Sequence, residues 1–440
     1  GVFMGAMVGD LGYLSVFLLA GLALRELVTP LQKLFLPAGL IGGVLALVMG
    51  PQVLGWIDIP KTFGGMAGPM IDIVLTCMIL GTTLNRERLR SFTGATTICA
   101  LTYFAQMAVG ALTGIVLSGF WPGMPKGWGV MAVFTYWGGH GAATAAGKLF
   151  ESLGEAENGM LAIGIILATL GLIVAMVVGM VLVNWGVRKG YATNLERGEK
   201  GEIKTQRGPI PVEKQKSLGN ATVASDALNG LALQLALVLV SIWVGRQIVA
   251  YLKPYMPIAK SFPSFFYGML GAFIIWTLMG CLKIQGYVDK KSVSTISGLA
   301  LEICICSATA TLNVKLLASY MAPILIHMVV IIVLMVFICM VIVKRWFKKD
   351  WLETGLLFFG QGTGSAPSGM ALGRCVDPEL RNTQAWEGFG VASALMGSVG
   401  SVLVAFMPVL TVQSVWIPIG IGAAVSVALF IFGETVVRGK

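Results

Sequence analysis

Two glycine-rich stretches, at residues 137–147 and 360–369, break apolar segments of the chain and carry its best-placed polar groups. A helix that stops at such a break leaves backbone carbonyls unpaired, and the helix that follows begins with unpaired N–H groups. These N–H groups and the positive end of the helix dipole bind anions, whereas free carbonyls bind cations. The predicted substrate-binding residues are Gly139, His140, Gly141 and Thr144 in the first stretch and Gly362, Thr363, Gly364, Ser365 and Ser368 in the second.

Close packing of small residues between helices is the alternative explanation for these glycines. It does not account for Pro367, or for consecutive glycines that occur twice at corresponding places. Ligand binding at the breaks is therefore the preferred interpretation.

A second set of polar residues could hold a cation. The sequence Thr-Leu-Asn occurs at 83–85 and again at 311–313, each time after a polar interruption of an apolar segment. Side-chain oxygens suit a hard cation such as sodium, and Glu302 is the deepest acid in an apolar segment. Helix capping by the two asparagines is an equally good explanation. The predicted sodium ligands are Thr83, Asn85, Thr311, Asn313 and Glu302.

The other reactive residues indicate no catalytic chemistry. Cys304 and Cys306 have no ligand-spaced partner and are expected to be buried thiols. Lys148 and Arg374 could hold a substrate carboxylate, but snorkelling to lipid headgroups explains them more simply. The sequence contains neither a paired nucleophile and base nor a phosphate-binding loop, so we predict that the chain is not an enzyme.

The composition indicates that lipid surrounds most of this chain. Of its 440 residues 56% are hydrophobic and 12% charged, and the mean hydropathy is +0.83. Apolar runs of roughly 20 residues, the length that spans a bilayer, follow one another almost end to end. The runs are continuous rather than alternating, which excludes a β-barrel. The net charge of +10 lies in short clusters between the runs, so nucleic acid is not an expected partner, whereas membrane lipids are.

We predict an all-α, polytopic membrane protein with about 11 transmembrane helices and two re-entrant hairpins, at 127–150 and 351–375. If both hairpins return to the side from which they entered, every basic cluster lies on one face, which places the N-terminus outside and the C-terminus in the cytoplasm. No cleaved signal peptide is predicted. The predicted spans are 11–28, 36–54, 66–84, 93–119, 159–187, 224–252, 263–282, 293–317, 320–343, 386–411 and 415–437.

The two halves of the sequence resemble each other. Pro37 with Gly42 recurs as Pro263 with Gly268, and other matched motifs keep the same order at an offset of 221 to 228 residues. Equivalent spans would run in opposite directions, which predicts an inverted repeat. The predicted units are a first repeat at 1–190, a cytoplasmic linker at 191–222, a second repeat at 223–411 and an extra span at 412–440.

Several of these motifs resemble the glutamate:sodium symporter family of bacterial inner membranes. The matching segments are Gly138–Gly141, Lys148–Phe150, Pro37–Gly43, Leu84–Asn85 and Gly360–Pro367. The resemblance implies a homodimer in which a mobile transport domain carries both hairpins past a rigid scaffold, in an elevator mechanism that couples glutamate uptake to sodium entry.

This chain departs from the family pattern in three places. The second hairpin reads Gly-Gln-Gly at 360–362 where the family has Gly-His-Cys-Gly, an expected acid is missing from 396–402, and a further C-terminal helix follows. These differences bear on the substrate more than on the fold.

The function predicted from the sequence is therefore sodium-coupled symport of L-glutamate or a similar small carboxylate, with sodium as the co-transported ion, in the bacterial inner membrane. A proton-coupled organic-acid carrier of the same fold is the first alternative. An ion channel is the second, although an inverted repeat with two hairpins suits alternating access better.

Overall fold

The computed structural model describes residues 2–33, 38–81, 92–154, 158–195, 207–256, 264–311, 313–349, 351–377 and 381–438. Within these residues the chain is helical and contains no β-strand, which confirms the all-α prediction. The predicted sodium ligands Thr83 and Asn85 lie outside the described residues, as do Pro37 and Pro263 of the repeat motifs.

Each predicted span overlaps a helix. In the described part of the chain, seven helices are long and apolar enough to cross a membrane: Met4–Leu27, Thr93–Phe120, Met160–Arg188, Gly230–Leu252, Ala318–Trp346, Gln384–Gln413 and Trp416–Val437. Two shorter apolar helices, Ala38–Met49 and Tyr267–Cys281, add to them. The chain is therefore an integral, multi-pass membrane protein, while the count of about 11 spans stays a prediction.

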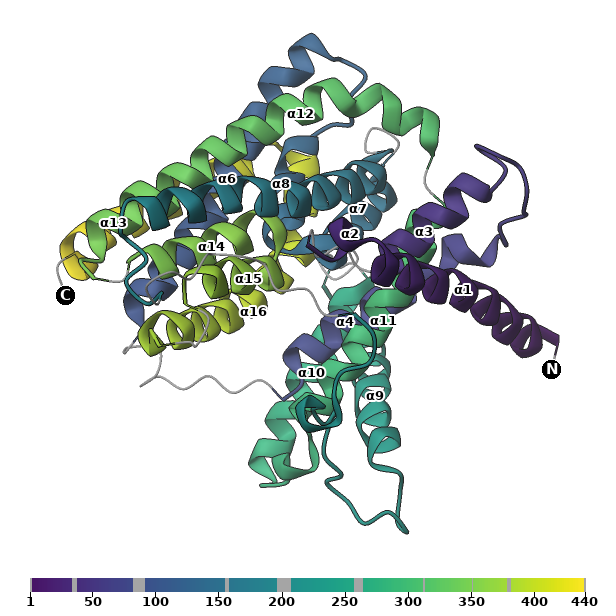
Figure 1. Ribbon diagram of the computed structural model, residues 1–440. Coiled ribbons are helices and arrows are strands. Elements are labelled where there is room, and N and C mark those ends of the chain that lie inside the picture. The colour runs from purple at the N-terminus through teal and green to yellow at the C-terminus, as the bar shows by residue number, and fades with distance from the viewer. Residues whose placement is uncertain are drawn as a thin grey trace.

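The helices form two packed bundles (Figure 1). The first bundle contains α1 (Val2–Leu27), α3 (Ala38–Met49), α4 (Thr62–Ile79), α9 (Gly230–Leu252), α10 (Ser264–Cys281) and α11 (Lys290–Ala310). The second, here named the hairpin bundle, contains α6 (Thr93–Phe120), α7 (Gly139–Leu153), α8 (Met160–Arg188), α12 (Val314–Val336), α14 (Trp351–Gly364), α15 (Ala366–Val376), α16 (Thr383–Gln413) and α17 (Trp416–Phe432). Each bundle takes helices from both halves of the chain, in the same order within each half.

Helix pairs of the first bundle meet at glycines. Gly21 of α1 packs on the backbone of α3 at Gly42, and a Cβ on Gly42 would collide with the carbonyl of Phe17. In the second half, Gly245 of α9 packs in the same way on the backbone of α10 at Gly271. Such close backbones leave no room for a side chain. The α1–α3 and α9–α10 pairs therefore use the same kind of contact.

The described part of the linker, residues 207–222, lies against one end of the first bundle. The backbone N–H of Gly208 donates to Glu26 Oε2 at 2.7 Å, just before α1 ends. The backbone N–H of Asn220 donates to Asp289 Oδ2 at 2.7 Å, just before α11 begins. The linker therefore contacts both the C-terminal end of α1 and the N-terminal end of α11.

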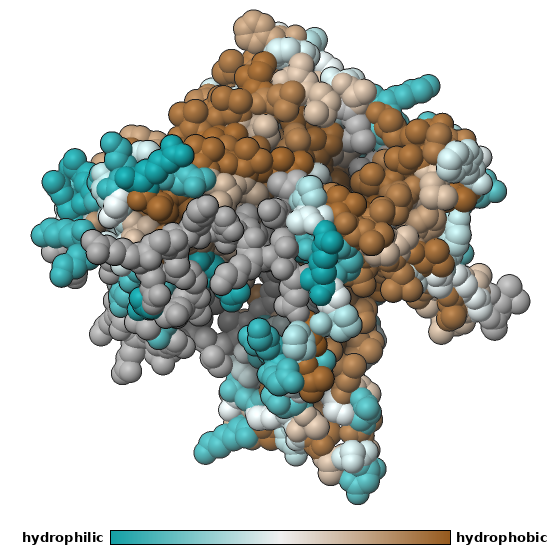
Figure 2. All heavy atoms as spheres, viewed as in Figure 1, coloured by the Kyte–Doolittle hydropathy of each residue, from teal (hydrophilic) through white to brown (hydrophobic). Residues whose placement is uncertain are grey.

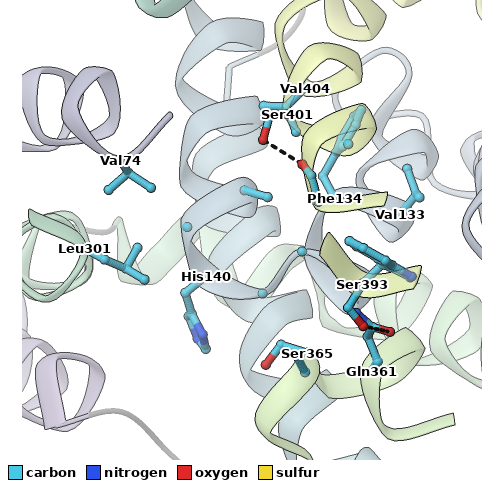
Figure 3. A pocket seen from close by; sticks show the side chains of 18 of the residues that line it. Val74, Val133, Phe134, His140, Leu301, Gln361, Ser365, Ser393, Ser401 and Val404 are labelled. Atoms are coloured by element: carbon cyan, nitrogen blue, oxygen red, sulfur yellow. Dashed lines mark hydrogen bonds between the residues drawn. The ribbon is translucent and has the colours of Figure 1, made fainter. Parts of the chain in front are cut away.

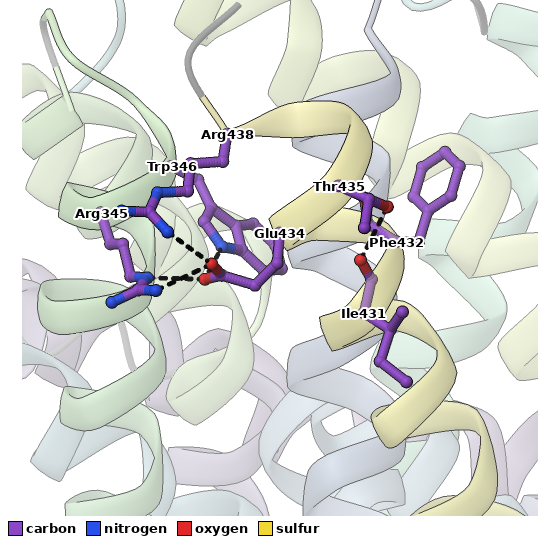
Figure 4. A network of polar contacts seen from close by, with 7 residues as sticks. All are labelled: Arg345, Trp346, Ile431, Phe432, Glu434, Thr435 and Arg438. Atoms are coloured by element: carbon purple, nitrogen blue, oxygen red, sulfur yellow. Dashed lines mark hydrogen bonds and ion pairs between the residues drawn. The ribbon is translucent and has the colours of Figure 1, made fainter.

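The last helix packs on the hairpin bundle. α17 runs along α6, with Gly422 against the α6 backbone. The turn that follows, Gly433–Val437, is held by the carboxylate of Glu434. This carboxylate accepts hydrogen bonds from Arg345 Nε at 2.7 Å and from Trp346 Nε1 and Arg438 Nη1 at 2.9 Å each (Figure 4). The extra C-terminal helix predicted from the sequence is thus part of the hairpin bundle.

Apolar side chains cover much of the face of the molecule seen in Figure 2. Leu19 of α1, Trp243 of α9, Val333 of α12 and Val427 of α17 each expose more than half of their surface. Exposed apolar surface on this scale would be costly in water, whereas contact with lipid tails removes that cost.

Candidate functional site

Both glycine-rich stretches contain a break between two helical arms. The first break separates residues 128–137 from α7, and Gly139 at the break has a φ of 67°. The second separates α14 from α15 at Ser365, whose φ is 76°. Glycine adopts such angles freely, but a serine at positive φ costs about 1–3 kcal/mol, and residues of this kind cluster at binding sites. α14 and α15 fold back on each other, with Gly360 packed against Gly369.

The two breaks touch each other. The backbone N–H of Ser365 donates to the carbonyl of Tyr136 at 3.3 Å, which links the second break to the arm before the first. A Cβ built on Gly139 would lie 3.3 Å from Cβ of Ser365. Segments more than 200 residues apart in the sequence thus form one tip-to-tip contact.

A cavity of about 430 Å³ lies at this contact, between the two bundles. One wall belongs to the first bundle and consists of Val74 of α4 with Leu301 and Ile305 of α11. Figure 3 shows Val74 and Leu301 on one side of the cavity, with His140 and Ser365 among the residues of the hairpin bundle. The wall of the first bundle is therefore apolar, and the polar groups come from the hairpin bundle.

Gln361 and Ser393 form the polar side of the cavity. Ser393 Oγ donates to Gln361 Oε1 at 3.1 Å (Figure 3). With its oxygen occupied, the Gln361 amide keeps its N–H₂ group, which has no hydrogen bond to the described part of the chain. Ser401 also lines the cavity, and its hydroxyl donates to the carbonyl of Gly397 at 2.8 Å.

Two buried aromatic residues add further donors to the lining. The hydroxyl of Tyr103 and Nε1 of Trp137 are buried and have no hydrogen-bond partner among the described residues. Their rings pack edge to face at 5.3 Å. Among the lining residues that the structure describes there is no Lys, Arg, Asp or Glu. Positive potential at the cavity comes from the N-terminal ends of α7 and α15, both of which begin in its wall.

Four of the nine predicted substrate-binding residues line the cavity, and the other five do not. Those that line the cavity are Gly139, His140, Gly141 and Ser365. His140 Nε2 also lies 3.0 Å from the hydroxyl of Thr169, which fixes its ring. The hydroxyls of the buried residues Thr144, Thr363 and Ser368 donate to carbonyls four residues earlier in the chain.

The two remaining predicted residues support the tip of α14 from behind. The carbonyl of Gly362 accepts a hydrogen bond from Gln106, and Gly364 packs against Ala175 of α8. Five further residues line the cavity that were not among the predicted substrate-binding residues: Gln361, Ser393, Ser401, Tyr103 and Trp137. Position 361 between two glycines was one available signal. The small residues Ser393, Gly397 and Gly400, spaced three to four apart along α16 and followed by Ser401, were another.

The predicted sodium ligands that the structure describes, Glu302, Thr311 and Asn313, do not line the cavity. Glu302 is half-buried in the first bundle, where its Oε2 accepts the backbone N–H of Gly39 at 3.0 Å near the start of α3. Thr311 lines a separate hollow of about 250 Å³ beside Gln52, and Asn313 is exposed. No group of three or more His, Cys, Asp or Glu residues forms a metal site in the described ranges.

The two halves of the chain also place a carboxylate at equivalent points behind the breaks. Glu151, at the end of α7, accepts the N–H groups of Gly159 and Leu161 at 3.2 Å, where α8 begins. Asp377, after α15, accepts the N–H of Asn382 at 2.9 Å, where α16 begins. Each broken stretch is thereby joined to the span that follows it.

A membrane-embedded helical protein with two broken helices that meet at a cavity between two bundles has the architecture of a secondary transporter. The family comparison agrees. The model of the sodium/glutamate symporter family matches residues 8–377, and the chain belongs to this family. This confirms the resemblance seen in the sequence motifs.

Comparisons with solved structures and with curated proteins do not refine this family assignment. Among solved structures, the sodium proton antiporter MjNhaP1 from Methanocaldococcus jannaschii is similar over 96% of this chain and 99% of its own, with 14% identity and a TM-score of 0.35. That score is too low to establish a shared fold. No curated protein matches the sequence significantly.

Proposed function

We propose that this protein takes up glutamate or a similar small carboxylate together with sodium, and that the cavity at the two breaks is its substrate site. The meeting of both breaks at one cavity between the bundles is the observation that carries the proposal. It agrees with the family to which the chain belongs.

The cavity suits a carboxylate without a lysine or arginine in its wall. The N-terminal ends of α7 and α15 direct the positive ends of their helix dipoles at an anion in the cavity. Gln361 adds side-chain N–H groups that Ser393 orients. We propose that the substrate carboxylate lies between these donors and that its remaining atoms contact Val74 and Leu301.

The arrangement of the helices supports an inverted repeat with an elevator motion. Each bundle contains corresponding helices from both halves, and the contacts at Gly21–Gly42 and Gly245–Gly271 recur between them. In this proposal the hairpin bundle, with 127–150 and 351–375 as re-entrant hairpins, is the mobile part. The apolar wall formed by α4 and α11 is the surface along which it moves, because an uncharged wall offers few polar contacts to break.

The orientation follows from the basic residues. The linker meets the first bundle where α1 ends and α11 begins. Arg345 and Arg438 both bind Glu434, where the spans Ala318–Trp346 and Trp416–Val437 end. By the positive-inside rule, these ends are proposed to be cytoplasmic in a bacterial inner membrane, with the N-terminus outside. A homodimer formed through the first bundle is also part of the proposal.

Uptake of labelled glutamate into proteoliposomes tests this function. We expect saturable uptake that requires an inward sodium gradient, and no uptake when potassium replaces sodium. Equal uptake with a proton gradient alone would remove the sodium coupling and favour the proton-coupled alternative. Non-saturating flux without counterflow would instead indicate a channel.

A further inference from the structure

Gln106 of α6 joins the first half of the chain to the second break. Its side chain is fully buried, and its Nε2 donates to the carbonyl of Gly362 in α14 and lies 3.0 Å from Met335 Sδ of α12. Gly362 lies three residues before Ser365, where the backbone turns at the cavity. Gln106 itself does not line the cavity, so it acts behind the tip of α14.

The break creates the need for such a donor. α14 ends at Gly364. The carbonyl of Gln361 still accepts the N–H of Ser365 at 3.1 Å, but the last carbonyls of the helix, from Gly362 on, have no partner within it. In a membrane protein these carbonyls must be satisfied by other parts of the protein, because lipid offers no donors. The Ser368 hydroxyl donates to the carbonyl of Gly364 at 2.8 Å, and Gln106 donates to the carbonyl of Gly362.

The position of Gln106 that forms this hydrogen bond also lowers the stability of the fold. Its Oε1 is buried without a hydrogen-bond partner among the described residues. An unpaired buried amide oxygen lowers stability, and a methionine of similar volume would avoid that penalty. The presence of an amide at position 106 is therefore better explained by its hydrogen bond to the Gly362 carbonyl than by a gain in folding stability.

The other half of the chain has a corresponding contact. His327 of α12 lies 221 residues after Gln106, the same offset that separates Gly139 from Gly360. His327 is fully buried, its Nε2 donates to the carbonyl of Gly110 at 3.0 Å, and its ring packs at 4.8 Å on Trp128 in the arm before the first break. Gln106 thus connects α6 of the first half to the broken helix of the second half. His327 in turn connects α12 of the second half to α6 and to the arm before the first break.

We propose that Gln106 is a positioning residue of the substrate site, which holds the Gly362 carbonyl and thereby sets where Gln361 and Ser365 face the cavity. The effect on transport rests on the proposed function, whereas the effect on the tip of α14 does not. Loss of the bond would let the last turn of α14 move and would weaken substrate binding without removing any group that touches substrate.

The test compares Gln106→Met with Gln234→Met in the full-length protein. Gln234 is a matched control, because it is also fully buried and its Nε2 donates to the carbonyl of Tyr287 at 2.8 Å, in the first bundle and away from the cavity. We expect Gln106→Met to raise KM for glutamate about fivefold, because that factor corresponds to the loss of one hydrogen bond. The change in kcat should be smaller. Gln234→Met should lower the melting temperature but keep the wild-type KM. An unchanged KM in Gln106→Met, or an equal rise in both variants, would overturn the inference.

Hydrogen exchange measured by mass spectrometry tests the same inference without substrate. We expect faster exchange of residues 360–366 in Gln106→Met and wild-type exchange there in Gln234→Met. If the wild-type protein shows no sodium-dependent uptake, the proposed function fails and exchange alone decides the role of Gln106, with unchanged exchange counting against it. If Gln106→Met does not fold, Gln106→Asn replaces it, because its shorter side chain withdraws the amide from Gly362.

Discussion

At the scale of single residues, polar groups around the cavity differ in what they are free to bind. Thr144, Thr363 and Ser368 use their hydroxyls within their own hairpins, so they stabilise the breaks instead of facing the cavity. Gln361 retains an N–H₂ group because Ser393 occupies its oxygen. The sequence motifs also predict that position 361 differs from the family pattern, which makes it the first residue to test for substrate choice.

Replacing Gln361 by Glu should weaken carboxylate binding. The change removes the N–H donors and places a negative charge beside the proposed position of the substrate. Hydrogen bonds to charged groups contribute about 1.5–3 kcal/mol, so we expect KM for glutamate to rise at least about tenfold. Ser393→Ala, which only releases the Gln361 oxygen, should have a smaller effect. Wild-type uptake by Gln361→Glu would show that Gln361 does not contact the substrate.

At the scale of secondary-structure elements, buried glycines and capped helix ends decide how the helices meet. The α9–α10 contact is so close that a Cβ on Gly271 would collide with the carbonyl of Ser241. The start of α11 is held by Asp289, whose carboxylate accepts the hydroxyl of Ser292 at 2.6 Å and the N–H of Asn220 at 2.7 Å. Each contact gives a separate prediction.

Gly271→Val should separate α9 from α10. Overpacking of this kind costs about 1–3 kcal/mol, so the melting temperature of the purified protein should fall. Gly420→Val in α17 is the control, because a Cβ at Gly420 meets no atom within 4 Å. Equal melting temperatures for the two variants would contradict the close contact at Gly271.

Asp289 should make the first bundle sensitive to acid. The Ser292 hydroxyl, followed by the Asn220 backbone, lowers the pKa of this carboxyl from 3.8 to about 2. A pKa that is lower in the folded than in the unfolded protein stabilises the fold above about pH 4, and this contribution is lost as the pH falls towards 2. Asp289→Asn should therefore show a smaller drop in melting temperature between pH 4 and pH 2. Parallel curves for wild type and variant would exclude Asp289 as the cause.

At the scale of the whole molecule, the cavity exists only where the two bundles meet. Gly141 of α7 faces Leu301 of α11 across this contact, and a Cβ on Gly141 would lie 2.8 Å from Leu301 Cδ1. The proposed elevator motion moves the two bundles past each other, so no side chain at this contact can protrude into the opposite bundle.

Gly141→Val should block transport but not folding. In a single arrangement of the two bundles, the Leu301 side chain can change rotamer to make room for the extra atoms of the new valine, so the protein still folds. The added methyl groups nevertheless narrow the cavity and obstruct the movement of α7 past α11. Since small misplacements at a site cost large factors in rate, we expect uptake to fall by at least about tenfold with normal expression. Gly64→Val is the control, because a Cβ at Gly64 meets nothing within 4 Å. Full uptake by Gly141→Val would argue against both the site and the motion.

Local signals in the sequence determined much of this protein. Continuous apolar runs, basic clusters and paired glycine-rich breaks predicted a helical membrane protein, the location of its helices and the two breaks, and the family comparison agrees with the motifs. Such features depend on neighbouring residues in the chain, because helix length, lipid burial and free backbone groups are set within one segment.

Only the tertiary structure decided which side chains share a cavity. Val74, Leu301 and Ser393 come from three helices far apart in the sequence, and no local pattern indicates that they face one space. It also brought Glu302 of α11 against the backbone of Gly39 near the start of α3, and placed Thr311 beside a second hollow, whereas the sequence had grouped both as sodium ligands. The physical reason is that packing of whole helices, through contacts such as Gly21 on Gly42, fixes which helix faces meet, and this information is absent from any single segment.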